Sequence, residues 1–185
     1  MSNQRVNENE KVATRDLTPG STDLFPRVFT EMPEIVRGDG AYIYDSDGNE
    51  YFDAIAGNQC CNIGHGVSEI AEAAAEQMER LEYTSSMLFV NDQSQAFAER
   101  MSEFLPDGLR HTWMVSGGSE ANESAIKMAR EYHRETGNPE KQMVIGRKLG
   151  YHGNTLGALS VTGMPSRREP FVPLLNEWPK APAAY

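Results

Sequence analysis

The stretch Ser116-Gly117-Gly118-Ser119-Glu120-Ala121 decides how this sequence is interpreted. The apolar run Trp113-Met114-Val115 precedes it and predicts a strand, whereas apolar residues recur behind it at helical spacing. A strand, a tight glycine turn and a helix start, in that order, direct backbone N–H groups and the positive end of a helix to one point. An anion, most often a phosphate, suits that point.

The helix behind the glycines has one apolar face, formed by Ala121, Ala125, Met128, Ala129 and Tyr132. Ser119 is predicted to cap this helix, and Gly137-Asn138-Pro139 to end it. On spacing alone, a simple turn between strand and helix is as good an interpretation as a phosphate site. A P-loop is excluded because no Gly-Lys-Ser/Thr follows, and the dinucleotide-binding spacing Gly-x-Gly-x-x-Gly is missing.

A second loop with glycines between a predicted strand and a predicted helix lies about thirty residues downstream. The run Gln142-Met143-Val144-Ile145 predicts a short buried strand, Gly150-Tyr151-His152-Gly153-Asn154 a loop, and residues 156–161 a helix. Both loops are expected at the carboxyl ends of parallel strands, where ligands of α/β proteins bind. Tyr151 either lies flat on a planar ring or is a half-buried loop tyrosine.

Four motifs in succession carry a family resemblance: GAYIYDSDGNEYFD at 40–53, NIGHG at 62–66, SGGSEANE at 116–123 and YHG at 151–153. From about Phe25 to Val172 the chain resembles the amino-terminal portion of the class III, pyridoxal-phosphate-dependent aminotransferases. The resemblance implies an α/β chain of the PLP-dependent transferase fold type I, in incomplete form. A small amino-terminal region is expected, followed by the start of a large domain with a mainly parallel sheet.

The resemblance implies pyridoxal 5′-phosphate as the cofactor and assigns seven residues to it, namely Gly117, Gly118, Ser119, Glu123, Tyr151, His152 and Gly153. The backbone N–H groups of Gly118 and Ser119, and the Ser119 hydroxyl, are expected to bind the cofactor phosphate. Tyr151 is expected to stack on the pyridine ring, while His152 and Gly153 shape that loop.

The remaining site residues concern the pocket floor and the substrate. Glu123 either belongs to the floor of the cofactor pocket or forms a solvated pair with Lys127. Asn58 and Gln59 are expected to line the substrate entrance. Many amine- and ω-amino-acid-specific relatives carry an aromatic residue there, so Gln59 is a departure that disfavours a hydrophobic amine pocket.

The activity implied is the transfer of an amino group from an amino donor to a keto acid or aldehyde, in a homodimer. A 2,1-aminomutase of the glutamate-1-semialdehyde type stays open as an alternative. The family's Schiff-base lysine and its acid paired with the pyridine nitrogen match no residue of this sequence, so no catalytic residue is assigned. The chain is therefore expected to be a fragment, inactive alone, and a non-catalytic truncated product is the third alternative.

Composition limits the partners. A net charge of −10 argues against binding nucleic acid or an anionic membrane. No apolar stretch approaches a membrane span and the start of the sequence is polar, so a cytoplasmic protein is expected. Cys60 and Cys61 are adjacent, which suits neither a mutual disulfide nor a zinc site, and no metal is expected.

Three segments are predicted along the chain: a mobile segment at 1–22, a small amino-terminal region with a β-hairpin at 23–60, and the first part of a cofactor-binding large domain at 61–185. The hairpin is predicted from alternating runs at 41–45 and 50–54 around Ser46-Asp47-Gly48-Asn49. Helices are predicted at 68–82 and around 97–105.

Overall fold

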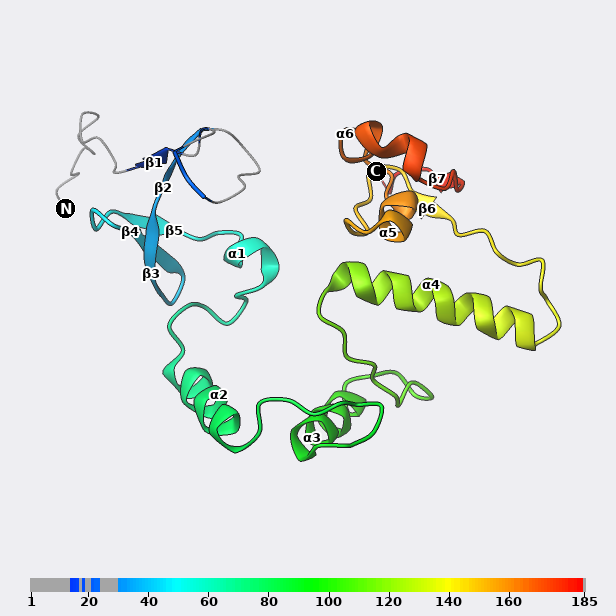
Figure 1. Ribbon diagram of the computed structural model, residues 1–185, viewed down its shortest axis with the longest axis horizontal. Coiled ribbons are helices and arrows are strands. Elements are labelled where there is room, and N and C mark those ends of the chain that lie inside the picture. The colour runs from blue at the N-terminus through cyan, green and yellow to red at the C-terminus, as the bar shows by residue number, and fades with distance from the viewer. Residues whose placement is uncertain (1–13, 17, 19–20, 24–29, 185) are drawn as a thin grey trace. The chain divides into compact units, whose positions relative to one another are not determined.

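A computed structural model describes residues 14–16, 18, 21–23 and 30–184 of the chain (Figure 1). It divides into two units, Met1–Val90 and Asn91–Tyr185. Residues 61–90 group with the first unit, so this division does not coincide with the boundary expected at residue 60, and the three-segment domain assignment stays a prediction. Most of the segment 1–22 lies outside the described residues, but Thr14–Asp16 within it forms a strand.

The first unit is built on two small antiparallel sheets. In one, β1 (Thr14–Asp16) pairs with β2 (Glu31–Pro33). The other has the order β3-β4-β5, with bounds Ile35–Asp39, Tyr42–Asp45 and Glu50–Phe52. The predicted hairpin is confirmed, because β4 and β5 pair around the 46–49 turn. Strand β3 was missed, since Arg37-Gly38-Asp39 shows no apolar alternation and the strand depends on pairing with β4.

A buried carboxylate closes the hairpin turn. Asp45 is 2% exposed. It accepts hydrogen bonds from the backbone N–H groups of Asp47 (3.0 Å) and Asn49 (2.8 Å), the Asn49 amide (2.9 Å) and the Tyr51 hydroxyl (2.8 Å). Burial alone would raise the pKa of Asp45, but these four hydrogen bonds outweigh it and hold the pKa below its usual value.

Two helical elements follow these sheets in the described part of the first unit. The short α1 (Ala56–Gln59) contains residues with positive φ and is a left-handed turn rather than a regular helix. Helix α2 (Ser68–Arg80) confirms the helix expected at 68–82, ending two residues earlier. Its apolar residues Ile70 and Met78 are 52% and 68% exposed, so within this unit the apolar face of α2 is uncovered.

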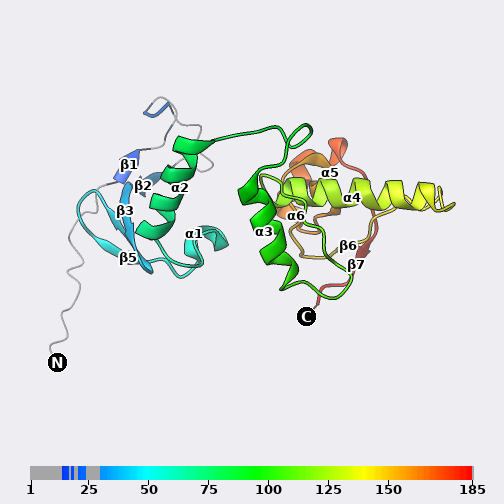
Figure 2. The same cartoon turned by 90° about the horizontal axis from the view of Figure 1, so that it is seen from below.

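The second unit follows the order α3-α4-β6-α5-α6-η1-β7, with bounds Asp92–Ser102, Gly118–Glu135, Gly146–Arg147, Leu156–Val161, Pro165–Arg168, Glu169–Leu174 (a 3₁₀ helix) and Lys180–Ala181. Strands β6 and β7 pair in parallel. Helix α5 lies beside the amino-terminal half of α4 (Figures 1 and 2). The buried apolar residues of the described chain are Ala158, Leu159 and Val161, all in α5. The core of this unit therefore sits at α5.

Three expectations for this unit are wrong. Residues 113–115 and 142–145 form no strand, and the two-residue strand β6 begins directly after the second run. A strand requires hydrogen bonds to a neighbour, and within the described residues neither run has one. Ser119 does not cap α4, which starts at Gly118 with Gly117 in the capping position. The predicted end is confirmed, because Thr136 caps the helix and Gly137 has φ 81°.

Candidate phosphate site at the start of helix α4

Three side chains of the first turns of α4 reach the loop before α5. Ser119, Asn122 and Glu123 stand at the i, i+3, i+4 spacing that places residues on one helical face. Each makes a hydrogen bond to the segment between His152 and Ala158. The predicted phosphate loop and the predicted ring-stacking loop are therefore joined in one site.

Ser119 and Gly153 form the tightest part of this junction. The Ser119 hydroxyl oxygen accepts a hydrogen bond from the Asn154 backbone N–H at 2.9 Å. Gly153 is buried, has φ 136°, and a Cβ added to it would lie 2.6 Å from the Ser119 Oγ and 2.8 Å from the Ala158 Cβ. Only glycine combines this backbone conformation with this close approach.

The peptide of His152 is held from both sides. The Asn122 amide donates to the His152 carbonyl at 2.6 Å, and the His152 N–H donates to the Thr162 hydroxyl oxygen at 2.9 Å. Thr162 is fully buried and donates in turn to the Ala158 carbonyl at 3.1 Å. Sequence reasoning missed both partners, although the position of Asn122 on the face of Ser119 was a usable signal.

Glu123 binds the start of α5. Its carboxylate accepts from the Thr155 hydroxyl at 2.5 Å and from the Ala158 backbone N–H at 3.0 Å. The pKa of Glu123 is lowered, first by the Thr155 hydrogen bond, against the opposing effect of burial, with a smaller contribution from the Lys127 charge. Glu123 therefore fastens α5 to α4 as an ionised carboxylate at neutral pH.

The start of α4 offers hydrogen-bond donors toward open space. The first hydrogen bond of the helix runs from the Ala121 N–H to the Gly117 carbonyl, so the N–H groups of Gly118 and Ser119 have no partner within the helix. A Cβ added to Gly117 or Gly118 would meet nothing within 4 Å. Because the Ser119 oxygen already accepts from Asn154, its hydroxyl hydrogen is available to a further acceptor. A set composed of donors alone fits an anion.

The aromatic residue of the second loop faces outward. Tyr151 is 56% exposed. Next to it, the His152 ring packs over Gly150, where an added Cβ would lie 3.1 Å from the His152 Nε2. That nitrogen is buried and has no hydrogen-bond partner among the described residues. The loop thus buries the His152 Nε2 and leaves Tyr151 exposed.

Asn58 and Gln59 belong to the first unit. Both are exposed and lie in the left-handed turn α1, with φ 65° and 69°. The Asp53 carboxylate lies behind this turn, and it contacts the Gly57 N–H and the His65 ring. The expected substrate residues are therefore displayed on a turn of unusual backbone geometry.

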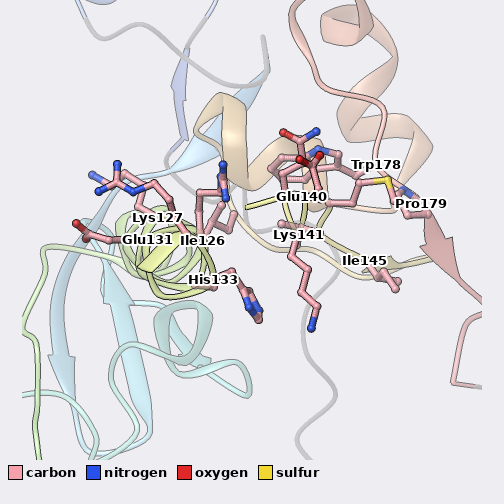
Figure 3. Close-up of a pocket in the computed structure, with 15 residues that line it drawn as sticks. Ile126, Lys127, Glu131, His133, Glu140, Lys141, Ile145, Trp178 and Pro179 are labelled. Carbon is pink, nitrogen blue, oxygen red and sulfur yellow. The ribbon is translucent and has the colours of Figure 1, made fainter. Parts of the chain in front are cut away.

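One hollow of the second unit lies away from this site. It measures about 1080 Å³ and is lined by the second half of α4, residues 140–145 and Trp178-Pro179 (Figure 3). None of the predicted site residues lines it. Across the described part of the chain, no group of three or more potential metal-ligating side chains is found, and no helix is long and apolar enough to cross a membrane.

Comparison with known proteins identifies the family. The chain belongs to the class III aminotransferases, whose family model matches residues 28–185. It is similar to a probable aminotransferase of Mycobacterium tuberculosis, with 44% identity over 144 residues, covering 78% of this chain and 31% of that protein. It is also similar to the putrescine–pyruvate aminotransferase of Pseudomonas aeruginosa, with 38% identity over 136 residues, covering 73% and 30%.

Solved structures agree with this family. The (S)-enantioselective omega-transaminase of Thermomicrobium roseum superposes with a TM-score of 0.84 at 37% identity, over 89% of this chain and 38% of that one. The α/β fold is thus that of a transaminase. The chain spans about a third of the length of the curated relatives it matches.

Proposed function

We propose that this chain forms the phosphate site of a pyridoxal-phosphate-dependent aminotransferase, which moves an amino group from an amino donor to a keto acid or aldehyde. The observation that carries the proposal is the donor set at the start of α4. This set consists of the N–H groups of Gly118 and Ser119 and the Ser119 hydroxyl, and the space beside Gly117 and Gly118 is open. The loop that is hydrogen-bonded to Ser119 carries the exposed Tyr151. A phosphate and a planar ring are the two parts of that cofactor.

Different residues of the chain would bind the phosphate and the ring of the cofactor. The Gly118 and Ser119 N–H groups and the Ser119 hydroxyl would bind the phosphate, and Tyr151 would lie on the ring. Glu123 and Gly153 would hold the loop against α4, as their contacts support. When bound, pyridoxal phosphate supplies an electron sink for the carbon that carries the amino group.

The reactive lysine then belongs to polypeptide outside these 185 residues. Amino-group transfer on this cofactor needs a lysine amine, and the family resemblance assigns that role to none of the five lysines of this chain. The Lys180 amine forms hydrogen bonds within the second unit, where it donates to the carbonyls of Ser160 (2.8 Å) and Trp178 (2.9 Å). The chain spans about a third of the length of its relatives, which accords with this view, and the chain alone is expected to be inactive.

Substrate contacts are assigned to Asn58 and Gln59 on the left-handed turn. Their amide groups favour polar substrate atoms over a hydrophobic amine. The Pseudomonas aeruginosa relative, which is named for putrescine and pyruvate, supports an amine donor with a keto acid acceptor as the substrate class. A cytoplasmic location accords with both cysteines being free thiols.

The partner is proposed to be a second copy of the chain. The run Met87–Val90 is apolar and exposed, with Met87 91% and Val90 81% accessible. Exposed apolar patches of this kind mark protein interfaces. Sedimentation of the Leu88→Ser variant is expected to show weaker self-association than the unmodified chain, and equal association would contradict a dimer contact at this run.

Ligand binding tests the phosphate site directly. Pyridoxamine 5′-phosphate is suitable, because its amine does not condense with surface lysines. We expect it to bind more tightly than pyridoxamine, and Ser119→Ala to weaken it about tenfold or more, since a hydrogen bond to a charged group contributes about 1.5–3 kcal/mol. Ser124→Ala on the same helix is the matched control. Equal affinity for the two ligands in equilibrium dialysis would refute the phosphate site.

A further inference from the structure

The turn Ala56–Gln59 has an uncommon backbone. Its φ values are all positive: 48° at Ala56, 56° at Gly57, 65° at Asn58 and 69° at Gln59. Three of these residues carry a Cβ, which makes the left-handed conformation unfavourable. Such geometry persists only where the surroundings hold it, and it gathers at functional sites.

A buried carboxylate holds this turn. The Asp53 Oδ2 accepts from the Gly57 backbone N–H at 2.7 Å and contacts the His65 Nε2 at 2.9 Å. The Asp53 side chain is 8% exposed and that of His65 21%. The Asp53 Oδ2 therefore connects the turn to the His65 ring, which lies several residues further along the chain.

Both groups are anchored to the turn between β3 and β4, at residues 40–41. The Asp53 N–H donates to the Ala41 carbonyl at 2.9 Å. His65 and Gly40 exchange two backbone hydrogen bonds, of 2.8 and 3.0 Å. Gly38 lies against the imidazole side chain, where an added Cβ would approach the His65 Cβ to 2.5 Å. The pair is thus a rigid connection from the sheet to the turn.

We infer that Asp53 and His65 are positioning residues for substrate selection, because they hold the left-handed turn that displays Asn58 and Gln59. The substrate part of this inference rests on the proposed function. The His65 hydrogen bond lowers the pKa of Asp53 and outweighs its burial, so the carboxylate is ionised at neutral pH. An ionised acceptor makes the stronger hydrogen bonds.

Two cysteines next to the turn provide a probe that needs no activity. The backbone N–H groups of Cys60 and Cys61 both donate to the Ala56 carbonyl, at 2.9 and 2.8 Å. The Cys61 sulfur lies 3.3 Å from the position a Cβ would take at Gly57. Opening of the turn therefore exposes Cys61, and in a Cys60→Ser background a thiol reagent measures that opening.

The expected effects separate positioning from general stability. Asp53→Ala should label at Cys61 about tenfold faster or more, because a charged hydrogen bond is lost. His65→Ala should also label faster, whereas His65→Gln should stay near the parent rate, since its amide N–H replaces the ring donor. Asp39→Ala, an exposed aspartate of the same sheet, is the control and should change nothing.

Each outcome decides the inference. If Asp53→Ala does not fold, the near-isosteric Asp53→Asn takes its place, with faster labelling again expected. Parent-like labelling in folded Asp53 variants, or failure of His65→Gln to restore slow labelling, would overturn the positioning role. In the whole enzyme, the Asp53 variants should raise KM for the amino acceptor more than they lower kcat. Fast labelling with an unchanged KM would support the role of Asp53 in holding the turn, but it would refute the substrate role of Asn58 and Gln59.

Discussion

Replacing Gly153 by alanine is expected to destabilise the packing of its loop against helix α4 at the candidate site. The residue has φ 136°, and the new Cβ would lie 2.6 Å from the Ser119 Oγ and 2.9 Å from the Ser119 Cα. A strained backbone of this kind costs about 1–3 kcal/mol. Overpacking against fixed neighbours costs about 1–3 kcal/mol more. The variant is therefore expected to lose about 2–6 kcal/mol of the stability of the second unit.

Urea unfolding measures this loss. Both tryptophans of the chain, Trp113 and Trp178, lie in the second unit, so tryptophan fluorescence reports on that unit alone. With a slope of about 1–3 kcal/mol per molar urea, a loss of about 2 kcal/mol or more should lower the midpoint by about 0.7 M or more. The slope itself should stay constant if the variant exposes the same surface area on unfolding as the parent.

Gly118→Ala is the matched control on the same site. A Cβ there meets nothing within 4 Å and stands in a helix, so stability should stay equal or rise by about 0.4–1 kcal/mol. The same methyl group enters the space proposed for the phosphate, so affinity for pyridoxamine 5′-phosphate should fall. If the two alanine variants unfolded at the same urea concentration, the close approach at Gly153 would be refuted.

Three further results are expected. Glu123→Ala should lower the stability of the second unit by about 1.5–3 kcal/mol in the same urea assay, and Glu123→Gln by less, because an amide oxygen still accepts both hydrogen bonds. Equal losses would contradict the part played by the charge. Because the pKa of Asp45 is lowered by folding, its contribution is complete above the unfolded value of about 3.9 and is lost as the pH falls through the folded pKa. Near-ultraviolet circular dichroism of the hairpin tyrosines should show this acid transition in the parent and a weaker one in Asp45→Asn. Burial is the main cause of the lowered pKa of Lys180, so the second unit should gain stability as the pH rises from the folded pKa toward about 10.4. Lys180→Met should remove that gain, as urea midpoints at two pH values would show.

Local patterns sufficed for the parts of the fold that are local. The hairpin at β4 and β5 was predicted because its turn and its alternating residues lie within fourteen positions. Helices α2 and α4 were predicted because their apolar periodicity and their breaking residues are neighbours in sequence. The strands at 113–115 and 142–145 were predicted wrongly, because an apolar run becomes a strand only when a neighbouring strand pairs with it.

The candidate site divides in the same way. Ser119, Gly153 and Tyr151 were singled out from motifs, and their assignment to the cofactor remains a prediction that the binding experiment tests. Asn122 and Thr162 were not found, because their significance lies in contacts with His152 that join residues 30 and 10 positions apart. The left-handed turn also escaped notice, since Ala56 and Gln59 have no sequence preference for positive φ.

The sequence by itself determined the family, the order of hairpin, helices and glycine loops, and the point where an anion is expected, because motifs and periodicity are written in neighbouring residues. Only the tertiary structure decided how Ser119, Asn122 and Glu123 join α4 to the loop of Tyr151, and how Asp53 holds its turn. Those arrangements depend on burial and on hydrogen bonds between distant segments, and no local pattern encodes such contacts.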